Sequence, residues 1–445
     1  MSLNSSLFIR DLGDGLILRR ASAEDVDALA EMNSLMHGDG PGQPNPRIGI
    51  WTRDLLTKPH PTLVPGDFTL VEETATGRIV STLCLIPQTW MYEDIEFGIG
   101  RPELVSTLPE FRNRGLVRIQ MEEVHKWSEE RGHFAQFITG IPYFYRQFGY
   151  DMTLDLAGRR YGFEANLPIL KEGQPEPYLL RPAVEADVEF IAQLYSESKK
   201  RYAIFCKRPA EIIRYEMSVQ SPDSIIHYDL AVVEDVKGER VGYIQHTTEL
   251  WNGGVHAVTF EIVRGASWLE IAPSVARYLW KKAGEYAERD SLPRTSFGFH
   301  LGEYHPVYES LDDRLPALRK PYAYYMRVPN LPGFLWHIRP ALEKRLAESV
   351  AAGFSGELRV GFYRDGLLIR FERGQIAAVE PLKVTSGVQV DANFPELTFL
   401  HLVFAYRSFD ELHHMFADCY WENNTARVLL NALFPKKLSA VYPVF

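Results

Sequence analysis

Cysteine is scarce in this chain of 445 residues, which contains only Cys84, Cys206 and Cys419. Because the three lie far apart and are odd in number, they suit neither a disulfide framework nor a metal site built on paired cysteines. Long apolar segments are also missing, since no run approaches the roughly 20 residues that span a bilayer. The first residues lack the basic and apolar regions of a signal peptide. We therefore expect a cytoplasmic protein without a membrane partner.

Positive charge is not in excess either. The formal net charge is −10, whereas nucleic-acid-binding proteins normally present a basic face, so we expect no nucleic-acid partner. An acidic protein can attract a cationic substrate, although many soluble proteins carry such a charge for solubility alone. Metal ligands are not clustered: His413 and His414, adjacent on an expected helix, would diverge by about 100°, so we expect no metal.

The chain contains an internal repeat. Residues 18–26 recur 162 residues later as residues 180–188, and residues 144–148 are echoed by residues 307–311 at nearly the same offset. Two matches in the same order indicate a duplicated domain. The polar, proline-containing segment 171–177 would link the two copies.

Composition and length point to a globular protein of several domains. Hydrophobic residues make up 46% and charged residues 24% of the chain, as in ordinary soluble proteins. A length of 445 residues suggests two to four domains. After the Pro/Gly-rich segment 329–333 the pattern changes, and Arg364-Asp365-Gly366 between two apolar strands is a strong hairpin signal. This part would form a third domain of mixed strands and helices.

The start of the first copy predicts alternating strands and helices. Residues 16–21 form an expected strand, and Ser22 is a plausible N-cap with Asp25 at the third position of a capping box. A further strand is expected over residues 79–86. Pro87 should stop it, because proline cannot donate a hydrogen bond to a ladder.

A strand, a polar turn and a helix follow one another after residue 103. Residues 104–107 are rich in β-branched side chains and predict the end of a strand, which Pro109 closes. The next turn contains Arg112, Arg114 and Gly115, and a helical apolar pattern then runs to about residue 131. The first N–H groups of a helix have no internal partner, and glycine lets a ligand approach the backbone. The sequence therefore predicts an anion site suited to a diphosphate.

Two short segments resemble those of a known enzyme family. The polar turn resembles the acetyl-CoA pyrophosphate loop of GCN5-related N-acetyltransferases (GNATs), Arg/Gln-x-x-Gly-x-Gly/Ala. Arg112 and Gly115 match it, whereas Val117 stands at the position of the small third residue. Residues 145–150, YRQFGY, resemble the Tyr-x-x-Phe-Gly-Tyr segment of the Eis-type (enhanced intracellular survival) acetyltransferases. Those enzymes join an active acetyltransferase domain, a degenerate second copy and a domain similar to sterol carrier proteins, an order that this chain resembles over its full length.

The resemblance implies a mixed α/β (α+β) fold of two tandem GNAT domains followed by a sterol-carrier-like domain. The predicted boundaries are 1–170, 178–330 and 335–445. We expect the second copy to lack a cofactor site, because bulky Trp268 stands where a diphosphate would need open backbone. The resemblance also implies a homohexamer.

Acetyl-CoA is the expected co-substrate. In the family geometry, backbone groups of Val105 and Thr107 would pair with its pantetheine arm; the simpler interpretation is an ordinary core strand, and both can hold. The expected cofactor-binding residues are Val105, Ser106, Thr107, Arg112, Asn113, Arg114, Gly115, Leu116 and Val117.

Acetyl transfer to an amine requires an acid for the leaving thiolate and a base for the ammonium. The resemblance implies Tyr145 as the acid, although it could also be one of several packing aromatic residues. It implies the terminal carboxylate of Phe445 as the base, while the aromatic end could instead dock the third domain. Glu103 is the reserve base, and Asp25 has a competing role at its helix start.

We therefore predict an acetyl-CoA-dependent N-acetyltransferase acting on primary amines of a cationic acceptor. The family suggests an aminoglycoside or a lysine side chain, so the partner would be a small-molecule or peptide amine. The alternative is a lipid-binding or interaction protein centred on the C-terminal domain, whose hairpin and apolar helices could enclose a lipid or simply fill a core.

Overall fold

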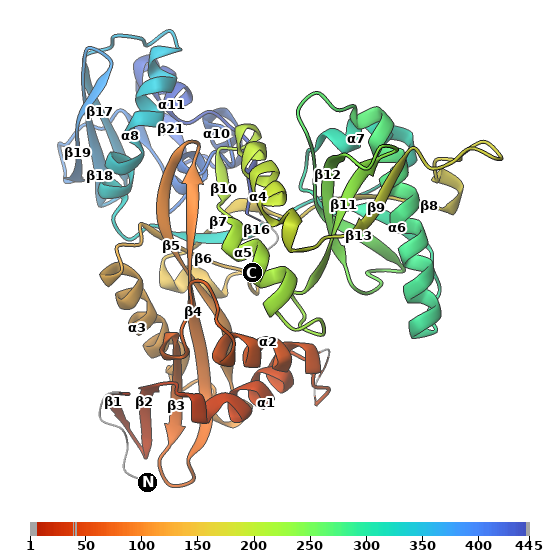
Figure 1. Cartoon of the computed structure of the whole chain (residues 1–445). Coiled ribbons are helices and arrows are strands. Elements are labelled where there is room, and N and C mark those ends of the chain that lie inside the picture. The colour runs from red at the N-terminus through yellow and green to blue at the C-terminus, as the bar shows by residue number, and fades with distance from the viewer. Residues whose placement is uncertain (1–6, 39, 41, 442–445) are drawn as a thin grey trace.

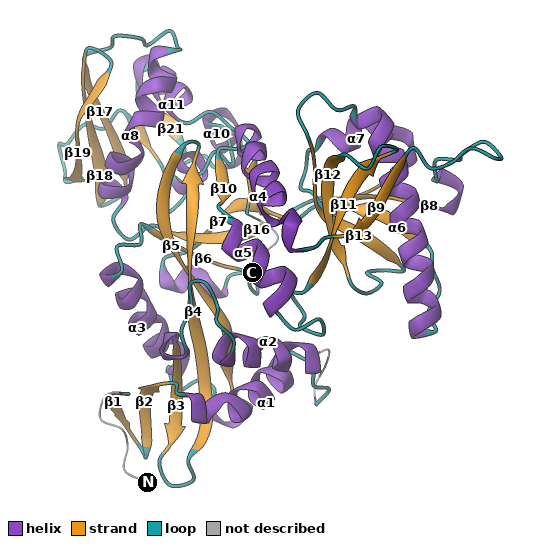
Figure 2. Cartoon of the chain, viewed as in Figure 1, coloured by secondary structure: helices purple, strands orange, loops and turns teal. Residues whose placement is uncertain are grey.

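The computed structural model describes residues 7–38, 40 and 42–441, and these form three β-sheets of ten, seven and five strands (Figure 1). Helices lie against each sheet, so the chain is a mixed α/β protein (Figure 2). In the described part of the chain, no helix is both long and apolar enough to cross a membrane.

The ten-stranded sheet is built mainly by the beginning of the chain. Its strands there are β1 (Phe8–Gly13), β2 (Leu16–Arg20), β3 (Phe68–Glu73), β4 (Arg78–Tyr92), β5 (Ile95–Thr107), β6 (Ala135–Ile138) and β7 (Asp151–Leu156). Strands β1 to β5 are antiparallel neighbours in chain order, and β6 runs parallel to β5. The predicted capping box of Ser22 and Asp25 is confirmed, and it leads through a short 3-10 turn into the first α-helix.

Helices cover both faces of this sheet. They are α1 (Val26–Met36), α2 (Pro46–Thr57) and α3 (Leu116–Glu130). Alternate residues of a strand point to opposite faces, and β4 divides accordingly. Cys84 and Ile86 pack in the cluster of α1 and α2, whereas Leu83 and Leu85 pack against α3.

Strand β4 does not end at Pro87 as predicted, but continues to Tyr92. Pro87 pairs with Gly100 of β5, while on the opposite edge the pairing of β4 with β3 extends only as far as Cys84, opposite Phe68. The strand β10 (Ile204–Cys206) takes up that edge only from Trp90 onward. Proline is therefore tolerated, because no neighbouring strand requires its missing N–H on that side.

The seven-stranded sheet repeats the order of the first. Its elements are β8 (Arg159–Phe163), β9 (Tyr178–Pro182), β11 (Tyr228–Asp235), β12 (Arg240–Thr247), β13 (Gly254–Ile262), β14 (Ser296–Phe299) and β15 (Ala317–Arg319). A long helix, α6 (Trp268–Asp290), connects β13 to the parallel strand β14, as α3 connects β5 to β6. Shorter helices are α4 (Val188–Glu197), α5 (Ala210–Arg214) and α7 (Pro306–Leu311).

An identical ion cluster occurs in both halves. Arg19 bonds Asp25 at 2.7 Å and Glu72 at 2.6 Å. Arg181 bonds Asp187 at 2.6 Å and Glu234 at 2.7 Å. Each of the three members lies 162 residues after its counterpart, the offset of the sequence repeat. The repeat therefore preserves a three-dimensional contact, including a glutamate that the sequence comparison did not single out.

Each half contributes one strand to the sheet of the other. Strand β16 (Tyr322–Arg327) lies between β6 and β7 in the first sheet, and β8 lies between β14 and β15 in the second. The boundaries 1–170 and 178–330 stay predictions, but the two sheets cross them through these exchanged strands. The halves cannot separate without breaking both sheets.

The last part of the chain contains the five-stranded sheet. Its main elements are α8 (Leu331–Ala347), β17 (Gly356–Phe362), β18 (Asp365–Glu372), β19 (Gln375–Lys383), β20 (Ala392–Asn393), α9 (Leu400–Val403), α10 (Phe409–Met415), β21 (Tyr420–Trp421) and α11 (Asn424–Leu433). The predicted hairpin is present, with its turn at Tyr363 and Arg364. After α11 the chain returns to the first sheet as β22 (Ser439–Ala440), which pairs with β10.

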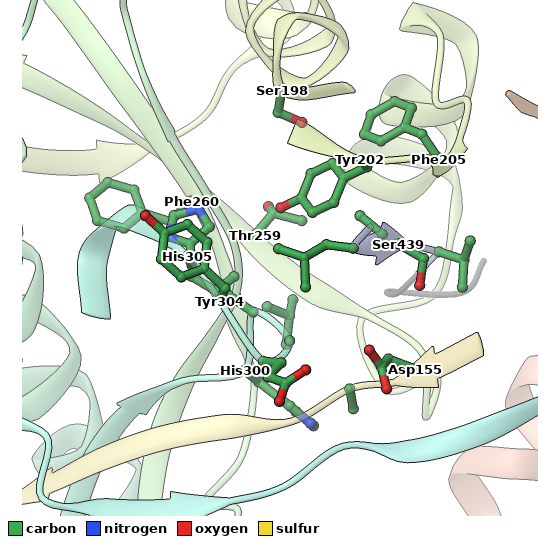
Figure 3. A pocket seen from close by; sticks show the side chains of 18 of the residues that line it. Asp155, Ser198, Tyr202, Phe205, Thr259, Phe260, His300, Tyr304, His305 and Ser439 are labelled. Carbon is green, nitrogen blue, oxygen red and sulfur yellow. The ribbon is translucent and has the colours of Figure 1, made fainter. Parts of the chain in front are cut away.

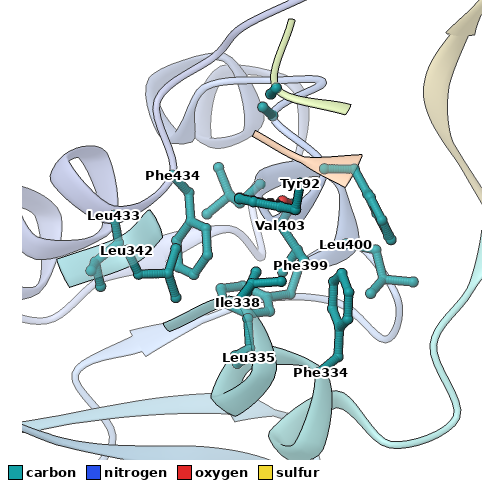
Figure 4. Close-up of a cluster of buried hydrophobic side chains, with 14 of the residues drawn as sticks. Tyr92, Phe334, Leu335, Ile338, Leu342, Phe399, Leu400, Val403, Leu433 and Phe434 are labelled. Atoms are coloured by element: carbon teal, nitrogen blue, oxygen red, sulfur yellow. Dashed lines mark hydrogen bonds between the residues drawn. The ribbon is translucent and has the colours of Figure 1, made fainter. Parts of the chain in front are cut away.

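The tip of the β4–β5 hairpin is inserted into this last part (Figure 4). The Tyr92 hydroxyl donates to the carbonyl of Val403 at 2.9 Å and accepts from Arg345 at 3.0 Å. Arg345 also pairs with Glu93 at 2.9 Å. A single apolar cluster thus extends from the first sheet into the third part of the chain.

Replacing Tyr92 with phenylalanine should therefore destabilise the protein by about 1–3 kcal/mol, because two buried polar partners lose a hydrogen bond. Urea unfolding followed by tryptophan fluorescence measures the change. The exposed Tyr363 provides the control, since Tyr363→Phe removes a hydroxyl that faces water. Equal unfolding midpoints for both variants would contradict the proposed anchoring.

Candidate functional site

Strands β5 and β6 pair only near the middle of β5. Their paired residues are Ile99 with Ala135 and Gly100 with Gln136. Further along, two residues of β5, Leu104 and Val105, stand opposite one residue of β4, which is a β-bulge. Leu104 has a positive φ of 53°. The backbone of β5 after Gly100 therefore has no partner in β6, and a gap opens in the sheet.

A cavity of about 790 Å³ occupies this gap. It is bounded by the end of β5, the polar turn, the start of α3, the end of β6 and the short helical turn 144–148. It brings together nearly all the residues predicted for the site. They are Val105, Ser106, Thr107, Arg112, Asn113, Gly115, Leu116, Val117 and Tyr145.

Arg114 does not line the cavity. Its guanidinium lies 3.4 Å from the carboxylate of Asp14 and stacks near the ring of Phe111. Arg112 is exposed on the cavity rim, and its Nε donates to the carbonyl of Thr107 at 3.4 Å. The charge of Arg112 is thus directed toward the cavity and that of Arg114 away from it.

The N-terminus of α3 opens into the cavity without a side-chain cap. Gly115 is the N-cap residue with φ of 76°, and the first internal bond runs from Ile119 N–H to its carbonyl at 3.1 Å. The preceding Asn113 also has a positive φ of 62°. Free N–H groups at the positive end of the helix dipole can bind an anion, as the sequence predicted.

Tyr145 lies at the opposite side of the cavity, in the helical turn after β6. Its side chain is mostly buried, and its hydroxyl has no hydrogen-bond partner within the described residues. Burial raises the pKa of this hydroxyl, and the charge of Glu103 acts in the same direction. Gly140 is required beneath the ring, because a Cβ there would lie 2.2 Å from Tyr145 Cε2. The hydroxyl is a neutral potential donor facing the cavity.

The carboxylates have different surroundings. Glu103 lines the cavity and pairs with the buried Arg101 at 2.6 Å. Asp25 bonds Arg19 and caps its helix start, so it has the structural role that was the alternative for it. Among the described residues, no group of three or more His, Cys, Asp or Glu side chains could hold a metal ion.

The cavity lining also contains residues that sequence reasoning missed, among them Met36 and His37. Met36 is the last residue of α1 and His37 is its C-cap. Both are far from the turn in sequence, and no local motif marks them. The predicted base, the carboxylate of Phe445, lies outside the described residues. Before it, Val441 is buried in the cluster that contains Trp90 and Phe137.

The corresponding region of the second half is nearly closed (Figure 3). A cavity of only about 60 Å³ lies between β13, the segment after β14 and the C-terminal strand β22. Trp268 begins α6 with its ring 4.8 Å from Phe260 and 5.1 Å from His305. Tyr308, the counterpart of Tyr145, is hydrogen-bonded to the backbone at Phe299, Leu301 and Gly302.

Comparison with known proteins agrees with this geometry. Residues 18–153 match the family model described as an acetyltransferase (GNAT) domain. No curated protein matches the chain.

Several solved structures are similar over the full length. A probable N-acyltransferase from Enterococcus faecalis V583, described as a conserved protein of unknown function, has 15% identity and a TM-score of 0.65, covering 96% of this chain and 100% of its own. A GCN5-related N-acetyltransferase from Kribbella flavida has 15% identity and a TM-score of 0.61, covering 98% of each chain. Eis1 from Mycobacterium abscessus has 13% identity and a TM-score of 0.57, covering 97% of this chain and 100% of its own.

At such identities the structures establish a shared fold, while the family model identifies the domain that contains the cavity. Residues 18–153 are therefore a GNAT acetyltransferase domain, and the protein is an N-acetyltransferase.

Proposed function

We propose that the protein is an Eis-type enzyme that transfers acetyl from acetyl-CoA to a primary amine of a cationic acceptor. The observation that carries this proposal is the cavity of about 790 Å³, where an uncapped helix N-terminus, an unpaired strand edge and the Tyr145 hydroxyl meet. Acetyl-CoA has a matching part for each of these features. Its diphosphate suits the helix N-terminus, its amide-containing arm suits the strand edge, and its leaving thiolate suits the Tyr145 hydroxyl.

Different residues along the cavity bind different parts of acetyl-CoA. The turn at Arg112 to Gly115 and the first N–H groups of α3 hold the diphosphate. The backbone of Val105 and Thr107 pairs with the pantetheine arm, which acts as a short additional strand. This arrangement directs the thioester toward the bulge at Leu104 and toward Tyr145.

The transfer requires that the nitrogen lose two protons and that the sulfur gain one. The free amine attacks the thioester carbon, so a C–N bond forms as the C–S bond breaks. Tyr145, whose raised pKa keeps it protonated at neutral pH, gives its proton to the departing sulfur. The carboxylate of Phe445 attracts the ammonium and accepts its first proton through water. As the amide forms, the nitrogen loses its second proton to solvent, and the Tyr145 hydroxyl regains a proton from solvent.

The second half would be a degenerate copy that supports the first. Its small cavity, the bulky Trp268 at the helix start and the fully bonded Tyr308 all support this assignment. The sterol-carrier-like character of the third part, and the hexamer that the resemblance implies, stay predictions.

A lipid-binding function remains the second candidate, because the third part contains a cavity of about 900 Å³. Aromatic and aliphatic side chains line it, together with Arg364 and Asp365. The interior beside it is filled by the hairpin tip and by packed aromatic residues (Figure 4). The core interpretation therefore accounts for most of the apolar residues of this part.

A panel of amines tests the proposed function. The purified protein is incubated with acetyl-CoA and with aminoglycosides or lysine-containing peptides, and released thiol is followed. We expect release that depends on an amine. A parallel thermal-shift titration compares acetyl-CoA with a fluorescent fatty acid, since a specific ligand raises the melting temperature. A shift with the fatty acid alone, without thiol release, would favour the lipid-binding alternative.

Glycine at position 115 should be required for cofactor binding. Gly115→Ala adds a methyl group where the diphosphate approaches, and we expect CoA affinity to fall about tenfold or more, equivalent to about 1.4 kcal/mol. Gly265→Ala is the matched control. It lies just before α6 with φ of 90°, and no atom lies within 4 Å of the added carbon at either position. Equal weakening in calorimetry would contradict the assignment of one active and one degenerate copy.

Tyr145→Phe should lower kcat by ~100-fold to ~10,000-fold while preserving CoA affinity and stability, because the lost hydroxyl is a proton donor. Tyr308→Phe should instead lower the stability of the protein and leave kcat unchanged. Its hydroxyl bonds three backbone groups and is remote from the cavity. Unchanged turnover of Tyr145→Phe, with product release shown not to limit the rate, would exclude Tyr145 from the mechanism.

The role of the terminal carboxylate can be separated from that of the ring before it. Extending the chain by two glycines beyond an intact Phe445 keeps the aromatic side chain and moves the charge. We expect a higher KM for cationic amines and a lower kcat, with unchanged CoA binding. Full activity of the extended enzyme would leave Glu103 or another cavity residue as the base.

A further inference from the structure

His37 is a titratable side chain of the cavity that the reaction above does not use. It follows α1 and lines the same cavity as Glu103, Ser106 and Tyr145. Its imidazole is partly buried, and Nε2 lies 2.9 Å from the hydroxyl of Ser106. Ser106 was predicted to contact the cofactor, but its side chain points to this imidazole and to the buried Asn33.

The hydrogen-bond network determines which imidazole nitrogen carries the proton. The Thr52 hydroxyl donates to the carbonyl of Ile48 at 3.0 Å, so it can only accept from Asn33 Nδ2 at 3.3 Å. Asn33 therefore presents Oδ1 to Ser106, whose hydroxyl donates to it at 2.9 Å. With its hydrogen engaged, the Ser106 oxygen must accept from His37 Nε2.

The neutral imidazole consequently carries its hydrogen on Nε2 and its lone pair on Nδ1. Among the described residues no group hydrogen-bonds Nδ1, and this atom is not among the buried polar atoms without a partner. The basic nitrogen of His37 is thus accessible. A histidine with a fixed tautomer and a free Nδ1 in a reaction cavity has the form of a general base.

The surroundings also favour the neutral state at pH 7. Burial lowers the pKa of His37, while the charge of Glu103 acts in the opposite direction. The charge of Glu103 also raises the pKa of Tyr145, so this one carboxylate lies near both side chains. An imidazole is a better match for an ammonium than a terminal carboxylate, whose ordinary pKa is about 3.5.

We propose that Nδ1 of His37 removes the proton from the acceptor ammonium before the amine attacks the thioester. This inference rests on the acetyltransferase function proposed above. The N–H bond of the ammonium breaks and its proton binds Nδ1, and the freed electron pair forms the new C–N bond. In this scheme His37 takes over the proton-accepting role assigned above to the Phe445 carboxylate, which only attracts the cation. The imidazolium returns its proton to solvent when the product leaves.

Chemical labelling tests the state of His37 without any acceptor. Diethyl pyrocarbonate acylates accessible, unprotonated imidazole nitrogens, and mass spectrometry locates the label. We expect rapid labelling of His37, as of the exposed His414, no labelling of the buried His256, and protection of His37 alone by saturating CoA. An unlabelled His37 beside a labelled His414 would overturn the proposal.

Kinetics test the role in transfer. His37→Gln keeps an amide donor for Ser106 but has no basic nitrogen, and we expect kcat to fall ~100-fold or more with acceptors that are ammonium ions at pH 7. The loss should nearly vanish with an alkoxyamine, which is already uncharged at that pH. His414→Gln is the control and should match the wild type; His37→Asn replaces His37→Gln if that variant fails to fold.

The outcomes distinguish a failure of the proposed role of His37 from a failure of the acetyltransferase function. Equal loss with both kinds of acceptor, or no loss with either, would exclude His37 as the base while leaving the acetyltransferase function intact. A wild-type protein that binds acetyl-CoA and acetylates no amine, charged or uncharged, would defeat the function itself and with it the role of His37.

Discussion

The gap between β5 and β6 is the feature on which the site depends. Once the pairing stops at Gly100, the backbone that follows is available to a ligand, and the bulge turns the strand toward the polar turn and α3. The bulge requires Leu104 to adopt a left-handed conformation, which is unfavourable by about 1–2 kcal/mol for a residue with a Cβ. Leu104 is almost fully buried in the cluster of α1 and α2, and burying a leucine contributes roughly 1.5–3 kcal/mol. The packing of the side chain therefore offsets the strain of the backbone.

The two halves show which parts of a duplicated fold are retained. The cluster of arginine, aspartate and glutamate occurs in both, at the same spacing and with similar distances. It joins a strand, a helix start and a neighbouring strand, so it has a structural role in each half. The open groove has no such role. In the second half, Tyr202, Phe205 and the β22 segment occupy the space beside β13 (Figure 3), and apolar contact there stabilises the assembled chain.

Local patterns predicted the local structure well. The capping box of Ser22, the polar turn before α3 and the hairpin at Arg364 are all determined by neighbours in sequence, and each is present. The bulge was not predicted, because leucine is not a residue that favours a positive φ. The passage of β4 through Pro87 also depends on where distant strands begin and end.

Features that join distant segments were beyond the reach of sequence patterns. The exchange of β8 and β16 depends on strands more than 130 residues apart. The contact between His37 and Ser106 depends on how α1 crosses the bulge, since neither residue lies in a recognisable motif. Only the fold brings a histidine from one segment onto the strand that the cofactor is expected to follow.

The exchanged strand also explains how the gap stays open. Unpaired strand edges tend to acquire a partner, and β6 is the natural partner for the end of β5. However, β6 is held on its other edge by β16, through Ile138 with Tyr325 and Phe137 with Met326. The opposite end of the β4–β5 hairpin is held by Arg345 and Val403 in the third part of the chain. Contacts from the second and third parts of the chain thus add to the bulge of β5 in fixing the two strands that border the gap.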